Sequence, residues 1–194
     1  MKMLTSETTL TLPDWLIERA LPERLASEAE QIELVLELAR LNFEHDTGGP
    51  FAAVVVESES GRLVSVGVNR VVPLACSSAH AEVMALTLAQ RALGAFDLGA
   101  DGLPAHGIAV NWRPCAMCFG AVLWSGVRSL ITAGSGPELE ELTGFDEGPL
   151  TPDWKEALAL RGIRVADAVA RERAIEVMRA FSRSGRPVYN GRGG

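Results

Sequence analysis

Two pairs of chemically active residues, each at the start of a predicted helix, limit the fold of this chain most strongly. His80 and Glu82 stand on either side of one alanine, and the apolar residues of a predicted helix over 80–93 follow them. Cys115 and Cys118 stand in the sequence Arg-Pro-Cys-Ala-Met-Cys, which begins the next predicted helix. If both pairs serve one site, the starts of the two helices must meet at one end of the molecule.

The residue types in these pairs are those of a metal site. Pro114 suits the first position of a helix, where its missing N–H costs nothing. Cysteines three residues apart near a helix start place both sulfurs on one side of a turn, and the helix dipole favours their thiolate forms. His80, Cys115 and Cys118 would leave the fourth tetrahedral position of Zn²⁺ open, which is the catalytic pattern rather than the structural one.

Glu82 indicates what a zinc ion would be used for. Zinc lowers the pKa of water, so that hydroxide forms near neutral pH. A carboxylate two residues from a ligand can reach that water without binding the metal. It can take the proton and deliver it later to a ring nitrogen and to a leaving amine. The pattern therefore indicates hydrolytic deamination of a C–NH₂ carbon in a nitrogen heterocycle.

Three other interpretations of these residues stay open at this point. Cys115 and Cys118 could be a thioredoxin-like redox pair in a cytosolic α/β protein. His80 could simply cap its helix. Cys76, the remaining cysteine, could supply a fourth ligand and make the site structural. The combination H-x-E followed by P-C-x-x-C is nevertheless the signature of zinc nucleobase deaminases.

Composition and charge exclude several broad classes of protein. With 194 residues, 47% of them hydrophobic and 22% charged, the chain fits one soluble domain. Its apolar runs are far too short to span a bilayer, and residues 1–12 lack the apolar core of a secretory signal. The net charge of −7 argues against nucleic acid as a partner. Three cysteines argue against a disulfide framework, and we expect a cytoplasmic protein.

Strands alternate with helices along the chain, which predicts an α/β fold. The first long helix opens with a capping box, Ser27 to Glu30, and ends at the Thr-Gly-Gly-Pro of residues 47–50. Short apolar strands are typical of a central sheet that helices cover on both faces. We therefore predict a three-layer α/β/α sandwich with a central, mixed five-stranded sheet. The predicted strands are 51–57, 62–68, 107–111, 128–133 and 163–165, and the further predicted helices are 80–93, 114–125, 153–160 and 166–181.

The chain divides into three predicted parts. Residues 1–26 hold two prolines and a short amphipathic piece over 14–24, and we expect them to form an N-terminal extension packed on the core. Residues 27–182 form the predicted zinc deaminase domain. Residues 183–194 are a positively charged C-terminal tail.

Several motifs along the chain occur together in one known family. They are Gly48-Gly-Pro-Phe-Ala-Ala53, Gly67-Val-Asn-Arg70, Ala79-His-Ala-Glu82, Pro114-Cys-Ala-Met-Cys-Phe-Gly-Ala121, Trp124 and Gly144-Phe-Asp-Glu-Gly148. The chain resembles the cytidine-deaminase-like superfamily and, within it, the small zinc-dependent guanine deaminases of bacteria. The resemblance covers most of residues 30–190. The last motif separates this group from tRNA adenosine deaminases, which share the zinc motifs.

The resemblance implies a catalytic role for each matching residue of the zinc motifs. It implies that His80, Cys115 and Cys118 bind zinc and that Glu82 is the proton shuttle. Glu147 would be a second acid, near the amino group of the substrate or the catalytic water.

The resemblance also implies how a nucleobase-like substrate is bound. Phe51 would stack on the base, and Asn69 would hydrogen-bond the amide edge of the ring. Family members of this type are homodimers, and in some of them the C-terminal segment crosses to the partner. Such a crossing would place Tyr189 in the partner's site. We also expect Ala81, Trp112 and Trp124 to bind the substrate, Trp112 independently of the resemblance.

The chain departs from the family pattern directly before Pro114. The family usually has a glutamate there, whereas this chain has Asn111-Trp112-Arg113, which changes the pocket rim or its supporting ion pair. We predict zinc-dependent deamination of guanine or a close analogue, giving xanthine or the corresponding oxo ring and ammonia. The alternatives are another aminated ring (a triazine such as ammeline, a pterin, another purine or a nucleoside), a tRNA adenosine deaminase, or a catalytically idle protein that binds a ligand.

Overall fold

The structure, a computed structural model, describes residues 4–191 and contains a five-stranded mixed sheet. Its strands are β1 (Ala52–Glu57), β2 (Leu63–Val68), β3 (His106–Val110), β4 (Ser129–Thr132) and β5 (Arg164–Ala166). They lie in the order β2-β1-β3-β4-β5. β1 pairs antiparallel with β2 and with β3, whereas β3–β4 and β4–β5 are parallel pairs.

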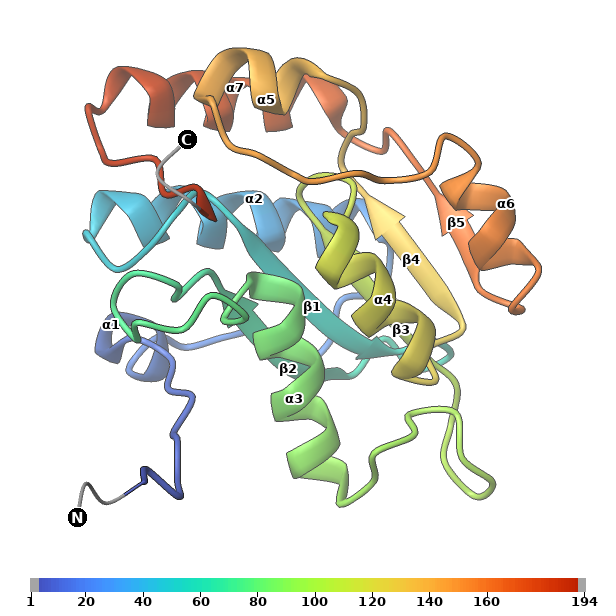
Figure 1. The fold of residues 1–194 in the computed structure, drawn as a ribbon. Helices are drawn as coiled ribbons and strands as arrows, with labels where there is room; N and C mark the ends of the chain where they lie inside the picture. Colours follow the sequence, from blue (N-terminus) through green and yellow to red (C-terminus); the bar gives the residue numbers. More distant parts are fainter. Residues whose placement is uncertain (1–3, 192–194) are drawn as a thin grey trace.

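Helices cover both faces of this sheet, as Figure 1 shows. One face is covered by α2 (Glu28–Glu44) and α7 (Arg171–Arg183), and the other by α3 (Ala81–Leu93), α4 (Ala116–Trp124) and α6 (Trp154–Ala159). Two short helices, α1 (Asp14–Ile17) and α5 (Glu138–Thr143), each contribute a buried leucine, Leu16 and Leu139, to the cluster on the α2 side of the sheet. The predicted three-layer α/β/α fold class is confirmed. Within residues 4–191, no helix has the length and apolar character that a membrane crossing needs.

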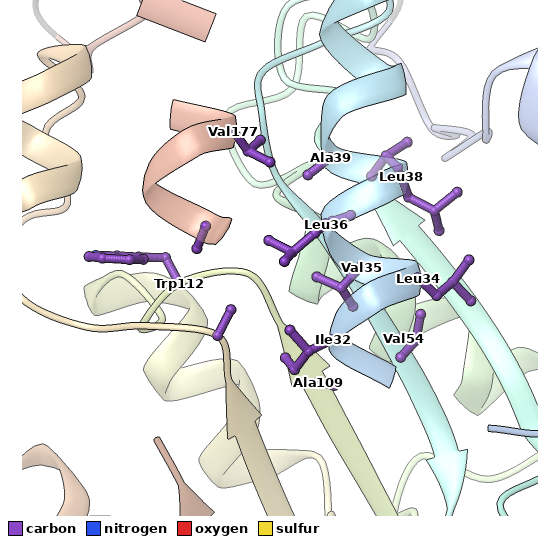
Figure 2. Packing of buried hydrophobic residues seen from close by; sticks show 14 of the residues in the cluster. Ile32, Leu34, Val35, Leu36, Leu38, Ala39, Val54, Ala109, Trp112 and Val177 are labelled. Atoms are coloured by element: carbon purple, nitrogen blue, oxygen red, sulfur yellow. The ribbon is translucent and has the colours of Figure 1, made fainter. Parts of the chain in front are cut away.

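The side chains of β1 alternate between two hydrophobic clusters, as a strand buried on both faces requires. Val54 and Val56 belong to the cluster that α2 covers with residues such as Ile32, part of which Figure 2 shows. Ala53 and Val55 belong to the opposite cluster, under α3 and α4. The continuous apolar run of β1 is therefore explained by burial on two sides.

The start of α2 follows the predicted capping box closely. The backbone N–H of Glu30 donates to Oγ of Ser27 at 3.2 Å. The Glu30 carboxylate in turn accepts the N–H of Ala26 at 2.6 Å, so the returning bond comes from one residue earlier than in the standard box. Two backbone donors that the helix cannot satisfy internally are thus satisfied by side chains.

Two helix predictions need correction. α5 was not predicted, because its six residues include three glutamates and too few apolar positions for a helical period. α7 begins at Arg171 and not at residue 166, since Ala168 has a φ of +62°, which a right-handed helix does not allow. The amphipathic piece predicted over 14–24 is helical only in α1.

The pairing of β1 gathers several segments of the chain at one edge of the sheet. Because β1 runs antiparallel to both neighbours, its first residues lie beside the last residues of β2 and β3. Ala52 pairs with Val68 of β2, and Ala53 pairs with Val110 of β3. The residue before β1 and the residues after β2 and β3 therefore lie at the same edge.

The starts of α3 and α4 meet at this edge as well. Gly67 of β2 leaves room for the first turn of α3, because a Cβ at this position would lie 2.2 Å from the carbonyl oxygen of Ala81. α4 begins only a few residues after the end of β3. The sheet topology thus brings the pair His80 and Glu82 close to the pair Cys115 and Cys118.

The N-terminal segment packs against the rest of the fold. Leu16 and Leu25 are buried in the cluster that α2 covers. The N–H of Leu25 donates to Gly61 O at 2.7 Å, and the N–H of Leu63 donates to Glu23 O at 2.9 Å. The first three residues of the predicted extension and the last three of the predicted tail lie outside the described residues.

Asp167, directly after β5, fastens the last part of the fold to the sheet. Its carboxylate accepts hydrogen bonds from Thr132 Oγ1 at 2.6 Å and from Ser135 Oγ at 2.7 Å, and it pairs with Lys155 of α6. Burial alone would raise the pKa of Asp167, but these three donors outweigh burial and lower the pKa. One side chain thus joins β4, α6 and the end of β5.

Removing this carboxylate should destabilise the protein measurably. Asp167→Ala leaves two hydroxyls and an ammonium without their acceptor, and we expect it to lower the free energy of unfolding by about 1–3 kcal/mol. Because the folded-state pKa of Asp167 is lowered, this contribution is present above the ordinary pKa of aspartate and is lost as the pH falls through the lowered value. Urea unfolding at neutral and acid pH measures both effects. A loss no larger than that of Asp101→Ala, an exposed control, would contradict this role.

Candidate active site

The predicted zinc ligands meet at the sheet edge. Nδ1 of His80 lies 3.6 Å from Sγ of Cys115, and the ligand atoms of His80, Cys115 and Cys118 all lie within 4.8 Å of one another. Zinc–sulfur and zinc–nitrogen bonds of about 2.3 and 2.0–2.1 Å, at a tetrahedral angle, separate the two ligand atoms by about 3.6 Å. The observed separation therefore fits a shared zinc ion.

Local structure explains why these side chains are available to a metal. His80 occupies the N-cap position of α3 but its side chain makes no capping hydrogen bond, so the cap interpretation is wrong. Cys115 occupies the N-cap position of α4, and its sulfur accepts the backbone N–H of Cys118 at 3.5 Å. The positive end of the helix favours a negatively charged sulfur there. Cys76 is a free cysteine outside the three-residue group and is not a fourth ligand.

The site concentrates negative charge in a buried place. The hydrogen bond with Cys118, helped by His80, lowers the pKa of Cys115 to about 4, whereas the same bond and burial raise the pKa of Cys118. Burial, together with the charge on Cys115, raises the pKa of Glu82. Burial and the charges of Cys115 and Glu82 raise the pKa of Glu147 to about 8. A bound dication would relieve this repulsion, which is a second observation in favour of a metal here.

A cavity of about 240 Å³ opens beside the metal-ligating group. Pockets for drug-sized ligands enclose about 300–1,000 Å³, so this cavity fits a bare base better than a nucleoside or a nucleic-acid strand. Its lining includes six of the residues predicted to serve the site, namely Phe51, His80, Glu82, Trp112, Glu147 and Tyr189.

Phe51 is held at the cavity by a buried asparagine to which sequence reasoning gave no role. Asn111, directly after β3, donates through Nδ2 to Pro50 O at 2.9 Å and accepts the N–H of Ala52 at 3.1 Å. The two bonds fix the backbone on both sides of Phe51. The ring of Phe51 packs edge-on against Phe145, with centroids 5.1 Å apart. An asparagine directly after a continuous apolar strand was the sequence signal that could have indicated a structural role for Asn111.

Asn69 contacts Tyr189 instead of lining the cavity itself. Its side-chain oxygen accepts the N–H groups of Gly49 and Val71, both at 3.3 Å. Its amide nitrogen donates to the hydroxyl of Tyr189 in the same chain. Burial raises the pKa of Tyr189, so this hydroxyl keeps its proton. The expected crossing of Tyr189 to a partner's site stays a prediction.

Glu147 reaches the cavity from a loop that is fastened to α4 and to the C-terminal segment. The N–H of Ala116 donates to Glu147 O at 3.1 Å. The N–H of Asp146 donates to Asn190 Oδ1 at 3.0 Å, and Asn190 Nδ2 donates to Gly144 O at 2.9 Å. The loop and the C-terminal segment therefore hold each other in place at the cavity.

The positive charge before Pro114 is balanced by an acid from the helix that the sequence did not predict. Nη2 of Arg113 lies 2.5 Å from Oε1 of Glu140 on α5. Trp112 is buried, and its Nε1 donates to Gly136 O at 3.2 Å. Both Trp112 and Arg113 line the cavity. The positive charge that Arg113 adds to the rim of the cavity is therefore neutralised by Glu140.

Besides Asn69, two residues predicted to bind substrate do not line the cavity. Trp124 is the last residue of α4, far along the helix from Cys115, and it is 78% exposed with Arg161 over its ring. Ala81 is buried in the first turn of α3, where its carbonyl faces Gly67. Neither side chain lines the cavity, and a role of Ala81 or Trp124 in substrate binding stays a prediction.

A larger groove, of about 840 Å³, lies between the N-terminal segment, α2 and α7. It holds none of the metal-ligating residues. Three of the four arginines that line it form ion pairs, Arg19 with Glu37, Arg40 with Glu44 and Arg173 with Glu33. The smaller cavity at the sheet edge is therefore the candidate active site.

Comparisons with known proteins agree with this geometry. Residues 26–133, more than half of the chain, match the family described as the cytidine and deoxycytidylate deaminase zinc-binding region. The chain belongs to this family. The expected zinc cofactor is thereby confirmed, and His80, Cys115 and Cys118 are the residues placed to hold it.

Similar proteins within the family include guanine deaminases. Guanine deaminase of Bacillus subtilis is 35% identical over 100 residues, which are 52% of this chain and 59% of that protein, so the match spans less than two thirds of that relative. The solved structure of guanine deaminase from Nitrosomonas europaea is 44% identical, with a TM-score of 0.87 over 94% of this chain and 100% of that one. A variant of the protein NE0047 with bound 8-azaguanine is 45% identical, with a TM-score of 0.87 over 92% and 98% of the two chains. The predicted resemblance is confirmed.

The metal site predicts about one zinc ion per purified chain, because three ligands already converge. Cys118→Ser should lose most of the zinc, whereas Cys76→Ser should keep it, since Cys76 lies outside the group. Zinc content should also fall as the pH falls, because the thiols and the imidazole must lose protons to bind the metal. Elemental analysis measures all three. Less than about half an equivalent in the parent, without recovery on adding zinc, would contradict the metal site.

Proposed function

We propose that this protein is a zinc-dependent aminohydrolase that converts guanine, or a close aminated analogue, to the oxo ring and ammonia. The observation that carries the proposal is Glu82, a buried acid that stands beside three metal-ligating residues and lines a cavity the size of a base. The relatives support it, since two are named guanine deaminase and a third binds 8-azaguanine.

Glu82 is the group that moves protons in the proposed reaction. When bound, Zn²⁺ supplies a Lewis acid that lowers the pKa of water toward neutrality. The Glu82 carboxylate accepts a proton from the water whose oxygen bonds to the ring carbon, and it donates that proton to the adjacent ring nitrogen. It then moves the second water proton to the amino group, so that the C–N bond breaks and ammonia leaves. Burial raises the pKa of Glu82 and brings its proton affinity closer to the working pH.

The rest of the cavity supplies a ring surface and polar partners. Phe51 offers an aromatic face on which a planar base can stack. Glu147 is a second, partly buried acid of the lining, available to the amino group or to the water. The hydroxyl of Tyr189, held by Asn69, is a further polar group of the lining.

Size and charge both favour a small ring over a nucleic acid. A cavity of about 240 Å³ leaves little room for a ribose in addition to a purine. The net charge of −7 opposes binding of a phosphate backbone. We therefore place a bare nucleobase, or a ring of similar size, in the cavity.

Replacing Glu82 tests the proposal directly. Glu82→Gln keeps the shape of the side chain but cannot carry a proton, so we expect turnover to fall on the order of 10²–10⁴-fold while zinc content stays unchanged. Ammonia release is measured with guanine, other purines, pyrimidines, triazines and pterins. Glu59→Gln, an exposed control, should match the parent.

Each alternative has its own outcome in this experiment. Turnover of Glu82→Gln within tenfold of the parent would mean that another group moves the protons. Inactivity of the parent on guanine together with fast turnover of another aminated ring would keep the reaction and replace the substrate. Inactivity on every small ring, with activity on tRNA, would overturn the argument from cavity size and charge.

We further propose that the protein works as a cytoplasmic homodimer. The outer side of α4 carries Trp124, which is 78% exposed, and Met117, which is 38% exposed, and the exposed Leu160 is a further large apolar residue. Exposed apolar patches of this kind usually mark interfaces. The free state of all three cysteines supports a reducing compartment.

Light scattering tests the dimer. The parent should have the mass of two chains at micromolar concentration, and Trp124→Arg should shift it toward one chain because a charge replaces an apolar contact. Phe96→Arg changes an equally exposed aromatic residue elsewhere and should leave the mass unchanged. A monomeric parent would refute the dimer and, with it, any role of Tyr189 in a partner's site.

A further inference from the structure

A relay of hydrogen bonds leads from the N-terminal segment into the protein interior. Nε1 of Trp15, in α1, donates to Oγ1 of Thr47 at 2.9 Å. That hydroxyl donates in turn to Asn42, whose side-chain oxygen lies at 2.8 Å and whose backbone oxygen lies at 3.0 Å. The indole of Trp15 also stacks on His45, with ring centroids 5.1 Å apart and an angle of 10° between the planes. Trp15 thus contacts the turn that follows α2 at two residues, His45 and Thr47.

The relay orients a fully buried amide. Asn42 has no exposed surface, and the bond from Thr47 identifies Oδ1 as its acceptor side. The two N–H bonds of Nδ2 then go to Gly49 O at 2.8 Å and to Asn69 O at 2.9 Å. Every polar atom of this side chain is paired, so rotation of the amide would leave buried groups unsatisfied.

Asn42 holds the two segments that carry the predicted base-binding residues. Gly48, with a φ of +153°, passes so close to Asn69 that a Cβ would lie 1.8 Å from its carbonyl oxygen. The N–H of Phe51 donates to Gly49 O at 2.8 Å, and the N–H of Asn69 donates to Phe51 O at 3.0 Å. The position of Phe51 relative to Asn69 therefore depends on the turn that Asn42 and Thr47 brace.

A second contact from the same segment reaches the same turn. Nη1 of Arg70, directly after Asn69, donates to Thr47 O at 2.9 Å. Nε of Arg70 donates to Thr11 O at 3.2 Å, which links this arginine to the N-terminal segment. Residues 11–15 therefore reach the base-binding segments by two routes, from Trp15 through Thr47 and Asn42, and from Thr11 through Arg70.

We propose that Trp15 is a positioning residue of the active site, through which the N-terminal segment fixes the geometry of Phe51 and Asn69. The inference rests on the proposed function, since that function places Phe51, and the Tyr189 hydroxyl that Asn69 holds, at the base. Trp15 is not in the cavity lining and acts through Thr47 and Asn42. The segment lies outside residues 26–133, the part of the chain that matches the family.

The relay is tested by changing its two exchangeable members in the full-length protein. Trp15→Phe keeps an aromatic ring for His45 but removes the donor, and Thr47→Val removes the hydroxyl at nearly constant volume. Both should weaken binding of 8-azaguanine and raise KM for guanine by the same factor, roughly three- to tenfold, while kcat and zinc content stay near the parent's. The double variant should be no worse than either single one, because both break the same relay.

Two control variants separate positioning from general stability. Thr47→Ser retains the hydroxyl and should recover affinity relative to Thr47→Val. Ile17→Ala removes an exposed apolar residue of the same helix and should leave KM, affinity and thermal midpoint unchanged. The proposal is overturned if Trp15→Phe and Thr47→Val leave both KM and affinity within twofold of the parent. It is also overturned if they only lower the thermal midpoint.

A measurement without substrate keeps this inference separate from the proposed function. If the parent neither deaminates guanine nor binds 8-azaguanine, the proposed function fails. Hydrogen exchange then still tests the relay. The amides of Gly49 and Phe51 should exchange faster in Trp15→Phe and Thr47→Val than in Ile17→Ala. The Gly49 amide donates to Asn69 Oδ1 and the Phe51 amide donates to Gly49 O, and both bonds depend on the turn that Asn42 braces. Unchanged exchange of both amides would overturn the positioning role.

Discussion

The antiparallel pairing of β1 between β2 and β3 is the constraint on which the site depends. It sets the start of one strand beside the ends of two others, so that Phe51, Asn69 and Asn111 share one edge of the sheet. The close approach at Gly67 brings the start of α3 to that edge, and the short link after β3 brings the start of α4. A shift of β1 by one residue would exchange its two buried faces and separate these groups.

The electrostatics of this edge explain why it can bind a metal ion and support a reaction. Two thiols and two acids are held close together. Burial and the charge on Cys115 raise the pKa of Glu82 and of Glu147, and the bond with Cys115, together with burial, raises the pKa of Cys118. The hydrogen bond with Cys118 lowers the pKa of Cys115 at the helix start. Such an arrangement is unfavourable unless a cation is shared. The same burial raises the pKa of Glu82, which suits a group that accepts and donates protons. Burial therefore favours both metal binding and proton transfer at this site.

Sequence reasoning reached the metal ligands and Glu82 because their signal is local. Two cysteines three residues apart on one helical turn, and a histidine two residues from a glutamate, need only a helix start to be recognised. It missed α5, whose acidic turn lacks an apolar period, and therefore missed Glu140 as the partner of Arg113. It noted Asn111 only as part of a departure from the family pattern, whereas the structure shows it bracing Phe51.

The amino-acid sequence by itself therefore determined which donor atoms the site has, the alternation of strands and helices, and the chemistry that these donors support. Folding in three dimensions set the volume of the cavity, the exclusion of Trp124 from it, and the bracing of Phe51 by Asn42 and Trp15. The physical reason is sequence distance. Asn42 meets Asn69, and Trp15 meets Thr47, only after the sheet and α2 have packed, and no local pattern marks a buried amide whose partners lie elsewhere in the chain.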